Sequence, residues 1–411
     1  MAKLRGFQEL TSIDEALLKF LNAAKVKKPA NTTLPLDNGL GRVLAETIRA
    51  KEDLPRVDRS AMDGYAVRAE DTFGASQFKP KILTLTDSHK VNCKCARRLW
   101  TGNSIPQGAN AVVVLENTRQ VDGKVEVWTP LTPGENVSKK GEDVTEGAVA
   151  AEAGTRLTPQ HLGLIAALGI SEIQVFKEPR IGVFSTGNEL AEVGARRQKD
   201  QIFDANRHII LAACRELGAR PVDLGIAKDD VEEIRERLRR SLEFDATIST
   251  GGTSVGGSDL MPETVSELGR PGIIVHGIAM RPAMPTALAV VDGKPMMIFP
   301  GNPVAAMIAF EVFARPLICR MLGLSHVEAR PTLMGKMTRR IATALGRRTF
   351  VRVHVFQRNG EYFSDPVSAK GSGVISTMTK SNGYTIVPEN REGLEEGETV
   401  LVHLFDVIGE V

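Results

Sequence analysis

Hydrophobic and polar positions between residues 179 and 324 alternate between strand-like runs and helical stripes. In the clearest stripe, Val231, Ile234, Leu238 and Leu242 recur at helical spacing after an Asp-Asp start. Further helices are expected over 206–217 and from 303 to about 322. The expected strands are 180–184, 221–226, 245–249, 272–276 and 295–299. Strands alternating with helices predict a parallel, doubly wound α/β sheet.

The flanking segments have other patterns. Short β-like runs separated by turns fill residues from about 50 to 140 and predict a β-rich insert, and a small β domain is expected after Arg330. A capping box from Ser12 to Glu15 opens a helix reaching about Ala24. The 154–178 segment returns to helix, with a Thr-Pro start at 158 and a glycine stop at 169.

A glycine-rich stretch over 249–261 follows the 245–249 strand directly. After Ser249, four glycines and four hydroxyl residues lead up to Asp259. Backbone N–H groups on such a turn make a concave anion site, and Asp259 could hold a hard cation such as Mg²⁺ at its mouth. A flexible linker is the simpler alternative, although a strand enters the stretch and a helix is expected to leave it. No Gly-Lys-Ser/Thr follows, so a P-loop is excluded.

Two more unusual loops, 185–189 and 300–303, also follow strands directly. Ligands bind outside the carboxyl ends of parallel strands, so the three loops should gather at one edge of the sheet. They contain no histidine or cysteine, which argues against a Ser-His-Asp type of nucleophilic catalysis. Glu189 and Asp259 beside an anion-binding backbone suit Mg²⁺-assisted chemistry on a phosphate ligand.

Three other features each allow two interpretations. Asp63 sits in a Met-Asp-Gly turn that is either functional or a simple hairpin turn. The charged run 139–143 is either part of a site or a solvated cluster. Cys93 and Cys95 form a lone CxC pair that is either a metal ligand or inert. Arg352 alternates with apolar residues, which predicts that it lines a face opposite the core.

Composition restricts the class of protein. The 411 residues are enough for about two to four domains. A formal charge of +2, with no run of like charges, gives no reason to expect nucleic acid as a partner. No apolar run approaches a membrane span and no signal peptide is visible, so a cytoplasmic protein is expected.

Seven motifs spread along the chain resemble those of the molybdopterin molybdenumtransferases, the family that includes the gephyrin E domain. They are SAMDGYAV (60–67), WTGNSIPQGANAVV (100–113), KKGEDV (139–144), FSTGNEL (184–190), TGGTSVGGSD (250–259), PGNPVA (300–305) and GSG (371–373). The glycine-rich motif alone would also fit the related pterin adenylyltransferases, but the set in this order is highly specific.

The resemblance implies four domains and a reaction. A helical linker domain is expected over 1–48 plus 142–178, a β-rich inserted domain over 49–141, an α/β molybdopterin-binding domain over 179–324 and a C-terminal β-barrel over 325–411. Such proteins form homodimers whose cleft joins the α/β domain of one chain to domains of the other. The implied reaction inserts molybdate into adenylylated molybdopterin with Mg²⁺, releasing AMP. The upstream adenylyltransferase and recipient molybdoenzymes are possible partners.

The resemblance also implies roles for individual residues. The catalytic candidates are Asp63, Thr101, Asp143, Glu189 and Asp259, of which Glu189 and Asp259 would also bind the metal. The pterin and adenylate would be held by Thr186, Gly187, Gly251, Gly252, Ser254, Gly256, Pro300, Asn302 and Pro303. The molybdate oxyanion would be held by Arg281, Pro282, Arg352 and Ser372. A guanidinium pair suits a tetrahedral dianion. The sequence does not distinguish molybdate from tungstate.

This chain departs from the family pattern at two places. Position 188 is usually Asp and is Asn here, and a pocket that usually reads Lys-Pro-Gly-Lys-Pro is Arg-Pro-Ala283-Met284-Pro. Ala283 adds a Cβ where the backbone approaches the ligand, and Met284 removes a cation from an anion site. Weaker anion binding is therefore expected. The alternatives to a transferase are an adenylyltransferase-like activity and a non-catalytic cofactor carrier.

Overall fold

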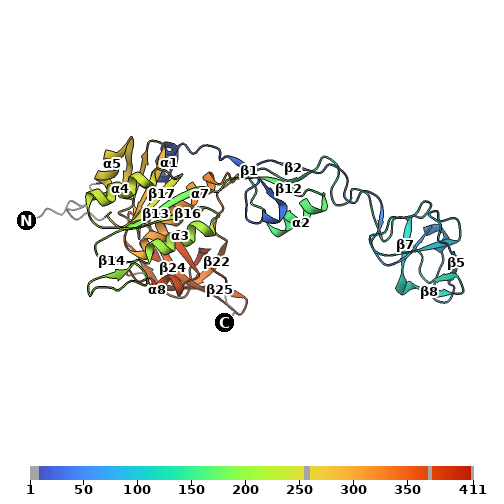
Figure 1. The fold of residues 1–411 in the computed structure, drawn as a ribbon. Helices are drawn as coiled ribbons and strands as arrows, with labels where there is room; N and C mark the ends of the chain where they lie inside the picture. The colour runs from blue at the N-terminus through green and yellow to red at the C-terminus, as the bar shows by residue number, and fades with distance from the viewer. Residues whose placement is uncertain (1–8, 254–259, 369–372, 409–411) are drawn as a thin grey trace, which may run out of the picture. The chain divides into compact units, whose positions relative to one another are not determined.

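The computed structural model describes residues 9–253, 260–368 and 373–408 (Figure 1). The chain divides into two compact units, Thr33–Val175 and Met1–Thr32 with Phe176–Val411. Across the described residues, none of the helices has both the length and the apolar character needed to span a lipid bilayer.

The larger unit contains a six-stranded sheet. Its strands, in spatial order, are β16 (Arg220–Ala227), β13 (Arg180–Thr186), β17 (Ala246–Thr250), β21 (Lys294–Phe299), β20 (Ala287–Val291) and β18 (Pro271–His276). The first four run parallel, as predicted, but β20 is antiparallel to both of its neighbours. The prediction of a fully parallel sheet is therefore wrong at this edge. The reason is a tight hairpin, in which Asp292 (φ 49°) and Gly293 (φ 81°) turn β20 directly into β21.

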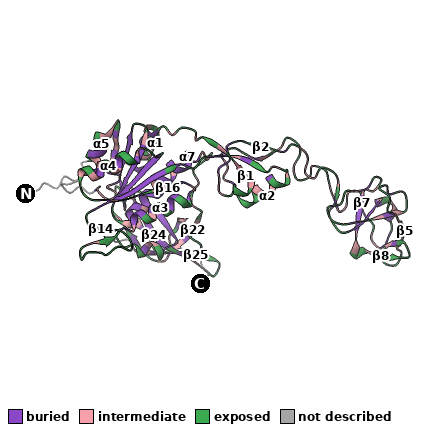
Figure 2. Cartoon of the chain, viewed as in Figure 1, coloured by how far each residue is buried: buried purple, intermediate pink, exposed green. Residues whose placement is uncertain are grey.

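Helices pack on this sheet and bury its strands (Figure 2). They are α1 (Ile13–Ala24), α3 (Asn206–Glu216), α4 (Val231–Ser241), α5 (Leu260–Leu268), α6 (Pro303–Ala309) and α7 (Arg315–Met321), with a π-helical turn at Phe310–Ala314. The predicted α4 is confirmed: Asp230 caps it by accepting hydrogen bonds from two backbone N–H groups, and Ile234 and Leu238 are buried. These apolar faces close the core over the strands.

Helix α1 packs against β18, β20 and β21. Ser12 caps it as predicted, but Glu15 pairs with Lys19 and does not return to the cap. Residues 13–24 therefore lie with the α/β sheet, whereas the predicted boundary assigned them to the linker domain.

The same unit ends in a closed β-barrel. Its strands follow one another as β24 (Arg348–Arg358), β25 (Glu361–Ser368), β22 (Thr332–Met337), β28 (Thr399–Leu404) and β26 (Gly383–Val387), and β26 pairs back with β24. Strand β19 (Met280–Arg281) of the α/β region adds to β24. The barrel core contains Val353, Val355 and Val402. Smaller elements are β23 (Ile341–Ala342), β27 (Gly393–Leu394), α8 (Ser376–Thr379), β14 (Leu190–Ala191) and β15 (Ile202–Phe203).

The smaller unit contains the predicted β-rich insert. Its sheet follows the order β7 (Ala111–Val114), β4 (Gly64–Val67), β6 (Cys95–Leu99), β5 (Lys81–Leu85), β9 (Lys124–Val127) and β8 (Thr118–Val121). Two-stranded ladders pair β1 (Asn31–Pro35) with β12 (Glu172–Phe176), β2 (Ile48–Arg49) with β11 (Val149–Ala151), and β3 (Arg59–Ser60) with β10 (Val137–Ser138).

The expectation of helix across 154–178 is only partly right. Helix α2 covers Pro159–Ala167, and Gly169 (φ 74°) ends it as predicted. Residues after this glycine form β12, in which Ile173 and Val175 alternate inward at strand spacing.

Candidate active site

The three unusual loops lie at one edge of the α/β sheet, as predicted for their described parts. They follow β13, β17 and β21, which are neighbours and run parallel. The Gly251 N–H donates to the Phe299 carbonyl at 2.9 Å, so the loop after β17 is hydrogen-bonded to the end of β21. The Asn206 side-chain amide, at the start of α3, donates to the Gly301 carbonyl at 2.7 Å. The loops are thus one structural unit.

Gly251 and Gly252 are required by close packing. Both have positive φ, 95° and 67°. A Cβ on Gly251 would stand 2.4 Å from the Thr186 carbonyl oxygen, and one on Gly252 would stand 2.6 Å from Met261. Only glycine allows the second loop to pass this close to the end of β13.

Buried polar atoms surround the same strand ends. Thr186 Oγ1, Ser249 Oγ and Asn206 Oδ1 are buried and have no hydrogen-bond partner within the described residues. Buried polar groups are nearly always satisfied, so these atoms mark a place where a polar ligand would complete the structure. His276 of β18 also reaches this region, where it is hydrogen-bonded to the Thr253 backbone, and burial lowers its pKa. Asn206 and His276 were not predicted as site residues, because their contacts are with residues distant in sequence.

Glu189 is exposed and folds back over the loop after β13. Its carboxylate lies so close to Gly187 that a Cβ there would stand 2.6 Å from Glu189 Oε2. Asn188 forms a different contact: its N–H donates to Asp229 Oδ2 at 3.1 Å, and its Oδ1 accepts from the Asp229 N–H at 3.3 Å. The unusual asparagine therefore binds the segment before α4.

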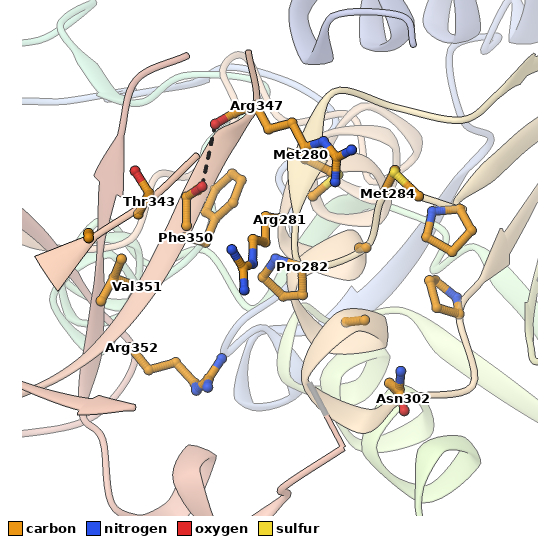
Figure 3. Close-up of a pocket in the computed structure, with 16 residues that line it drawn as sticks. Met280, Arg281, Pro282, Met284, Asn302, Thr343, Arg347, Phe350, Val351 and Arg352 are labelled. Carbon is orange, nitrogen blue, oxygen red and sulfur yellow. Dashed lines mark hydrogen bonds between the residues drawn. The ribbon is translucent and has the colours of Figure 1, made fainter. Parts of the chain in front are cut away.

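A cavity of about 340 Å³ lies beside the third loop. Five of the predicted residues line it: Arg281, Pro282, Pro300, Asn302 and Arg352. Further lining residues come from β19 and the loop after it, from α6 and from the barrel: Met280, Ala283, Met284, Pro285, Ala305, Ala342, Thr343, Arg347, Thr349, Phe350 and Val351. In Figure 3 the guanidinium groups of Arg281 and Arg352 face the same part of this cavity.

The cavity is suited to an anion. Its described lining residues include three arginines and no acidic side chain. Arg352 alternates with the barrel-core residues Val351 and Val353, which places it on the opposite face of β24 as predicted, and there it is buried at the cavity wall, only 4% exposed. Burial lowers the pKa of its guanidinium. Three arginines around one cavity, one of them buried, favour an anionic ligand.

Ala283 and Met284 both line the cavity. Ala283 has φ 79°, a conformation that favours glycine, and it is held there because Thr286 Oγ1 donates to its carbonyl at 2.8 Å. Met284 contributes an apolar side chain where the family pattern has a lysine. Arg347 was not predicted and also lines this cavity, and in Figure 3 its side chain extends toward Met284.

Two predicted residues meet in the smaller unit. The Asp63 carboxylate accepts from the Thr101 backbone N–H at 2.7 Å and from its hydroxyl at 2.8 Å. The backbone bond, followed by the hydroxyl bond, lowers the pKa of Asp63. Asp143 is exposed, and its N–H donates to the Leu54 carbonyl. Cys93 is exposed, with its Sγ 3.4 Å from Asp71 Oδ1. The described residues contain no group of three or more potential metal ligands.

The remaining predicted residues have the following positions. Pro303 is the first residue of α6. Ser254, Gly256, Asp259 and Ser372 lie outside the described residues. Gly373 follows Ser372 in the chain. A Cβ on Gly373 would stand 3.5 Å from Asn302 Oδ1, so the barrel segment at 373 lies close to a cavity residue.

Three family models match the chain in order. They describe a MoeA N-terminal region (domain I and II) at residues 11–169, a probable molybdopterin binding domain at 182–320 and a MoeA C-terminal region (domain IV) at 334–405.

Full-length relatives agree with these models. A putative molybdopterin biosynthesis protein of Methanocaldococcus jannaschii is 38% identical, covering 98% of this chain and 100% of the relative. The molybdopterin molybdenumtransferase of Haemophilus influenzae is 32% identical over 97% of this chain and 99% of its own. A crystal structure of the molybdopterin biosynthesis protein MoeA of Pyrococcus horikoshii OT3 is similar with a TM-score of 0.82 and 30% identity, covering 97% of this chain and 100% of that one. The chain therefore belongs to the molybdopterin molybdenumtransferase family.

Proposed function

We propose that this protein inserts molybdate into adenylylated molybdopterin, with Mg²⁺ and release of AMP, to form molybdenum cofactor. The observation that carries the proposal is the continuity of two sites. Pro300 and Asn302 belong to the third loop of the sheet edge and also line the arginine-rich cavity. A pterin ligand on the loops would thus reach an oxyanion in the cavity.

Different residues of the chain would bind the molybdate and the adenylate phosphates. Arg281 and Arg352 would bind molybdate from two sides, with Pro282 and Ser372 shaping the site; Pro282 lines the cavity beside the arginines. The buried hydroxyl of Thr186 and the backbone near Gly251 and Gly252 would bind the phosphates, with Gly187, Ser254, Gly256 and Pro303 completing the loops. Fixed donors of this kind hold a charged ligand without reorganisation.

The Glu189 carboxylate is compatible with Mg²⁺. The cation typically takes one or two carboxylates and fills its other positions with water and substrate phosphates, so a cluster of three protein ligands is not needed. Glu189 is exposed beside the strand ends, and we propose that it binds Mg²⁺ together with Asp259. When bound, the cation would neutralise charge on the adenylate phosphates.

We further propose a cytoplasmic homodimer in which Asp63, Thr101 and Asp143 complete the cleft of the partner subunit. The hydrogen-bonded Asp63 and Thr101 support a prearranged polar group of this kind. The four-domain division with boundaries at 48, 141, 178 and 324 stays part of this proposal, with the 13–24 helix packed on the α/β sheet. Contacts with the upstream adenylyltransferase and with recipient molybdoenzymes are also part of it.

The test mixes purified protein with adenylylated molybdopterin, Mg²⁺ and molybdate and follows AMP. We expect AMP release that depends on molybdate and is lost in Arg352→Ala. AMP appearing no faster than without protein would leave the carrier interpretation, and consumption of ATP with molybdopterin would indicate the adenylyltransferase reaction.

A further inference from the structure

The backbone next to the cavity is connected to two segments distant in sequence. The Thr11 N–H donates to the Gly277 carbonyl at 3.1 Å, and the Ala279 N–H donates to the Thr11 carbonyl at 2.8 Å. The Ala279 carbonyl accepts from the Arg348 N–H at 3.0 Å, where β19 pairs with β24. The segment leading into Arg281 is therefore bonded both to the N-terminal segment and to the barrel.

An ion pair joins those two outer segments to each other. Arg348 donates to both oxygens of Asp14, at 3.0 and 2.8 Å, and its Nε lies 3.0 Å from Glu389 Oε1. This bidentate geometry fixes orientation as well as distance. The Arg348 side chain is 25% exposed and that of Asp14 is 75% exposed. The hydrogen bond and charge of Arg348 lower the pKa of Asp14 against the raising effect of burial.

Both ends of this ion pair are attached to the site. Asp14 lies in the first turn of α1, which Ser12 caps and whose Ile13, Ala16 and Phe20 are buried. Arg348 begins β24, in which Thr349 and Arg352 line the cavity. The α1 helix is thus a fixed point, connected through one carboxylate to the strand that carries Arg352.

We propose that the Asp14–Arg348 ion pair is a positioning device for the oxyanion cavity, holding β24 against the 279–281 segment so that Arg281 and Arg352 face one anion. This inference rests on the proposed function, because it takes molybdate as the anion. Two guanidinium groups repel each other in the empty cavity, so an external tie that keeps them in place lowers the cost of ordering them when the anion binds.

Exposed ion pairs contribute little to stability, which allows a positioning role to be distinguished from a structural one. In Asp14→Ala and in Arg348→Ala we expect a dissociation constant for molybdate raised about three- to tenfold, with a nearly unchanged melting temperature. The double variant should be no weaker than either single variant. Asp14→Glu should recover part of the affinity. In turnover, the KM for molybdate should rise while kcat at saturating molybdate stays close to its original value.

Arg235→Ala is the matched control. Arg235 is 22% exposed and pairs with two carboxylates, Glu232 and Glu267, but it joins α4 to α5 and does not line the cavity. Its loss should leave molybdate affinity unchanged. Calorimetric titration of the full-length protein with molybdate, and hydrogen exchange of amides over 277–286 and 348–352, give the two readouts.

The outcomes separate the inference from the proposed function. Unchanged molybdate affinity and unchanged amide exchange in Asp14→Ala would overturn the positioning role, as would equal losses in Arg235→Ala. If the unsubstituted protein binds no molybdate, even with adenylylated molybdopterin present, the proposed function fails. Hydrogen exchange then decides the positioning role alone, which requires faster exchange over both segments in Asp14→Ala.

Discussion

Asn188 and Asp229 bind each other through two reciprocal hydrogen bonds, at 3.1 and 3.3 Å, that join the loop after β13 to the start of α4. The asparagine that departs from the family pattern therefore has a structural partner in this chain. An aspartate at 188 would still accept from the Asp229 N–H, but it would add a second carboxylate beside that of Asp229. The neutral amide avoids this repulsion.

We accordingly expect Asn188→Asp to lower the free energy of unfolding by about 0.5 to 1 kcal/mol at neutral pH, through repulsion between two exposed carboxylates. Chemical denaturation at low salt measures it. Asn188→Asp with Asp229→Asn should recover the stability, because one carboxylate is removed. A single variant as stable as the unsubstituted protein would show that the two carboxylates do not meet.

Gly251→Ala should affect both folding and ligand binding. Its Cβ would meet the Thr186 carbonyl at 2.4 Å, in addition to the cost of φ 95°. We expect a loss of about 3 kcal/mol or more, or a displaced loop with weak binding of molybdopterin. Gly293→Ala is the control, because Gly293 has φ 81° and open space around it. That variant should lose only about 1 to 2 kcal/mol; similar losses in both thermal melts would refute the steric argument.

Ala283→Gly tests the strained turn in the cavity wall. Alanine at φ 79° is strained by about 1 to 2 kcal/mol, and glycine relieves this strain. Glycine also makes the unfolded chain more flexible, which offsets about 0.5 to 1 kcal/mol of the stabilisation. A stabilisation of up to about 1 kcal/mol is expected, measured by denaturant unfolding. Ala279→Gly, at a residue without positive φ, should instead destabilise the protein.

The sequence predicted the location of the site better than its walls. The loops at 185–189 and 300–303 could be placed together because β13 and β21 run parallel on either side of β17, and parallel strands bring their carboxyl ends to one edge. Strand β20 was not predicted, although Asp292-Gly293 between apolar runs is a hairpin signal. Arg352 alternates with apolar residues as a solvent-facing residue would, and only the tertiary structure shows that its side chain enters a cavity.

Contacts between residues far apart in sequence account for most of the rest. The bonds of Asn206 to Gly301 and of His276 to Thr253 have no local pattern in the chain. The same holds for Arg347, which stands 63 positions after Met284 and lines the same cavity. Such pairs depend on how the barrel closes on the α/β sheet, which periodicity does not encode.

Met284→Lys should strengthen anion binding in the cavity. The substitution adds a cation to a wall that has three arginines and no described acidic residue. We expect molybdate to bind about three- to tenfold more tightly at low salt, with the gain shrinking as salt is added. Met334→Lys, on an exposed residue of β22 outside the cavity, is the control for net charge. Calorimetric titration with molybdate measures both affinities. Equal gains in affinity in both variants, or no gain in Met284→Lys, would contradict a local effect of the added charge.

Glu311 should control how the larger unit responds to acid. This carboxylate of the π-helical turn pairs with Arg315 at 2.8 Å and with Arg330 at 2.7 Å. Burial would raise its pKa, but the hydrogen bonds from Arg330 and Arg315 outweigh burial and lower it below the ordinary value of 4.5. Removing the charge leaves two arginines without their shared partner, so Glu311→Gln should lose about 3 kcal/mol at neutral pH.

The pH dependence of that loss has a defined sign. Because the folded-state pKa is lowered, the contribution of Glu311 is fully present above its ordinary pKa and is lost as the pH falls through the folded-state value. The difference in unfolding free energy between the unsubstituted protein and Glu311→Gln should therefore be constant from about pH 6 to 8 and shrink below about pH 4.5. Denaturant titrations across this range measure it. A difference that grows in acid would mean that Glu311 is not held ionised by the two arginines.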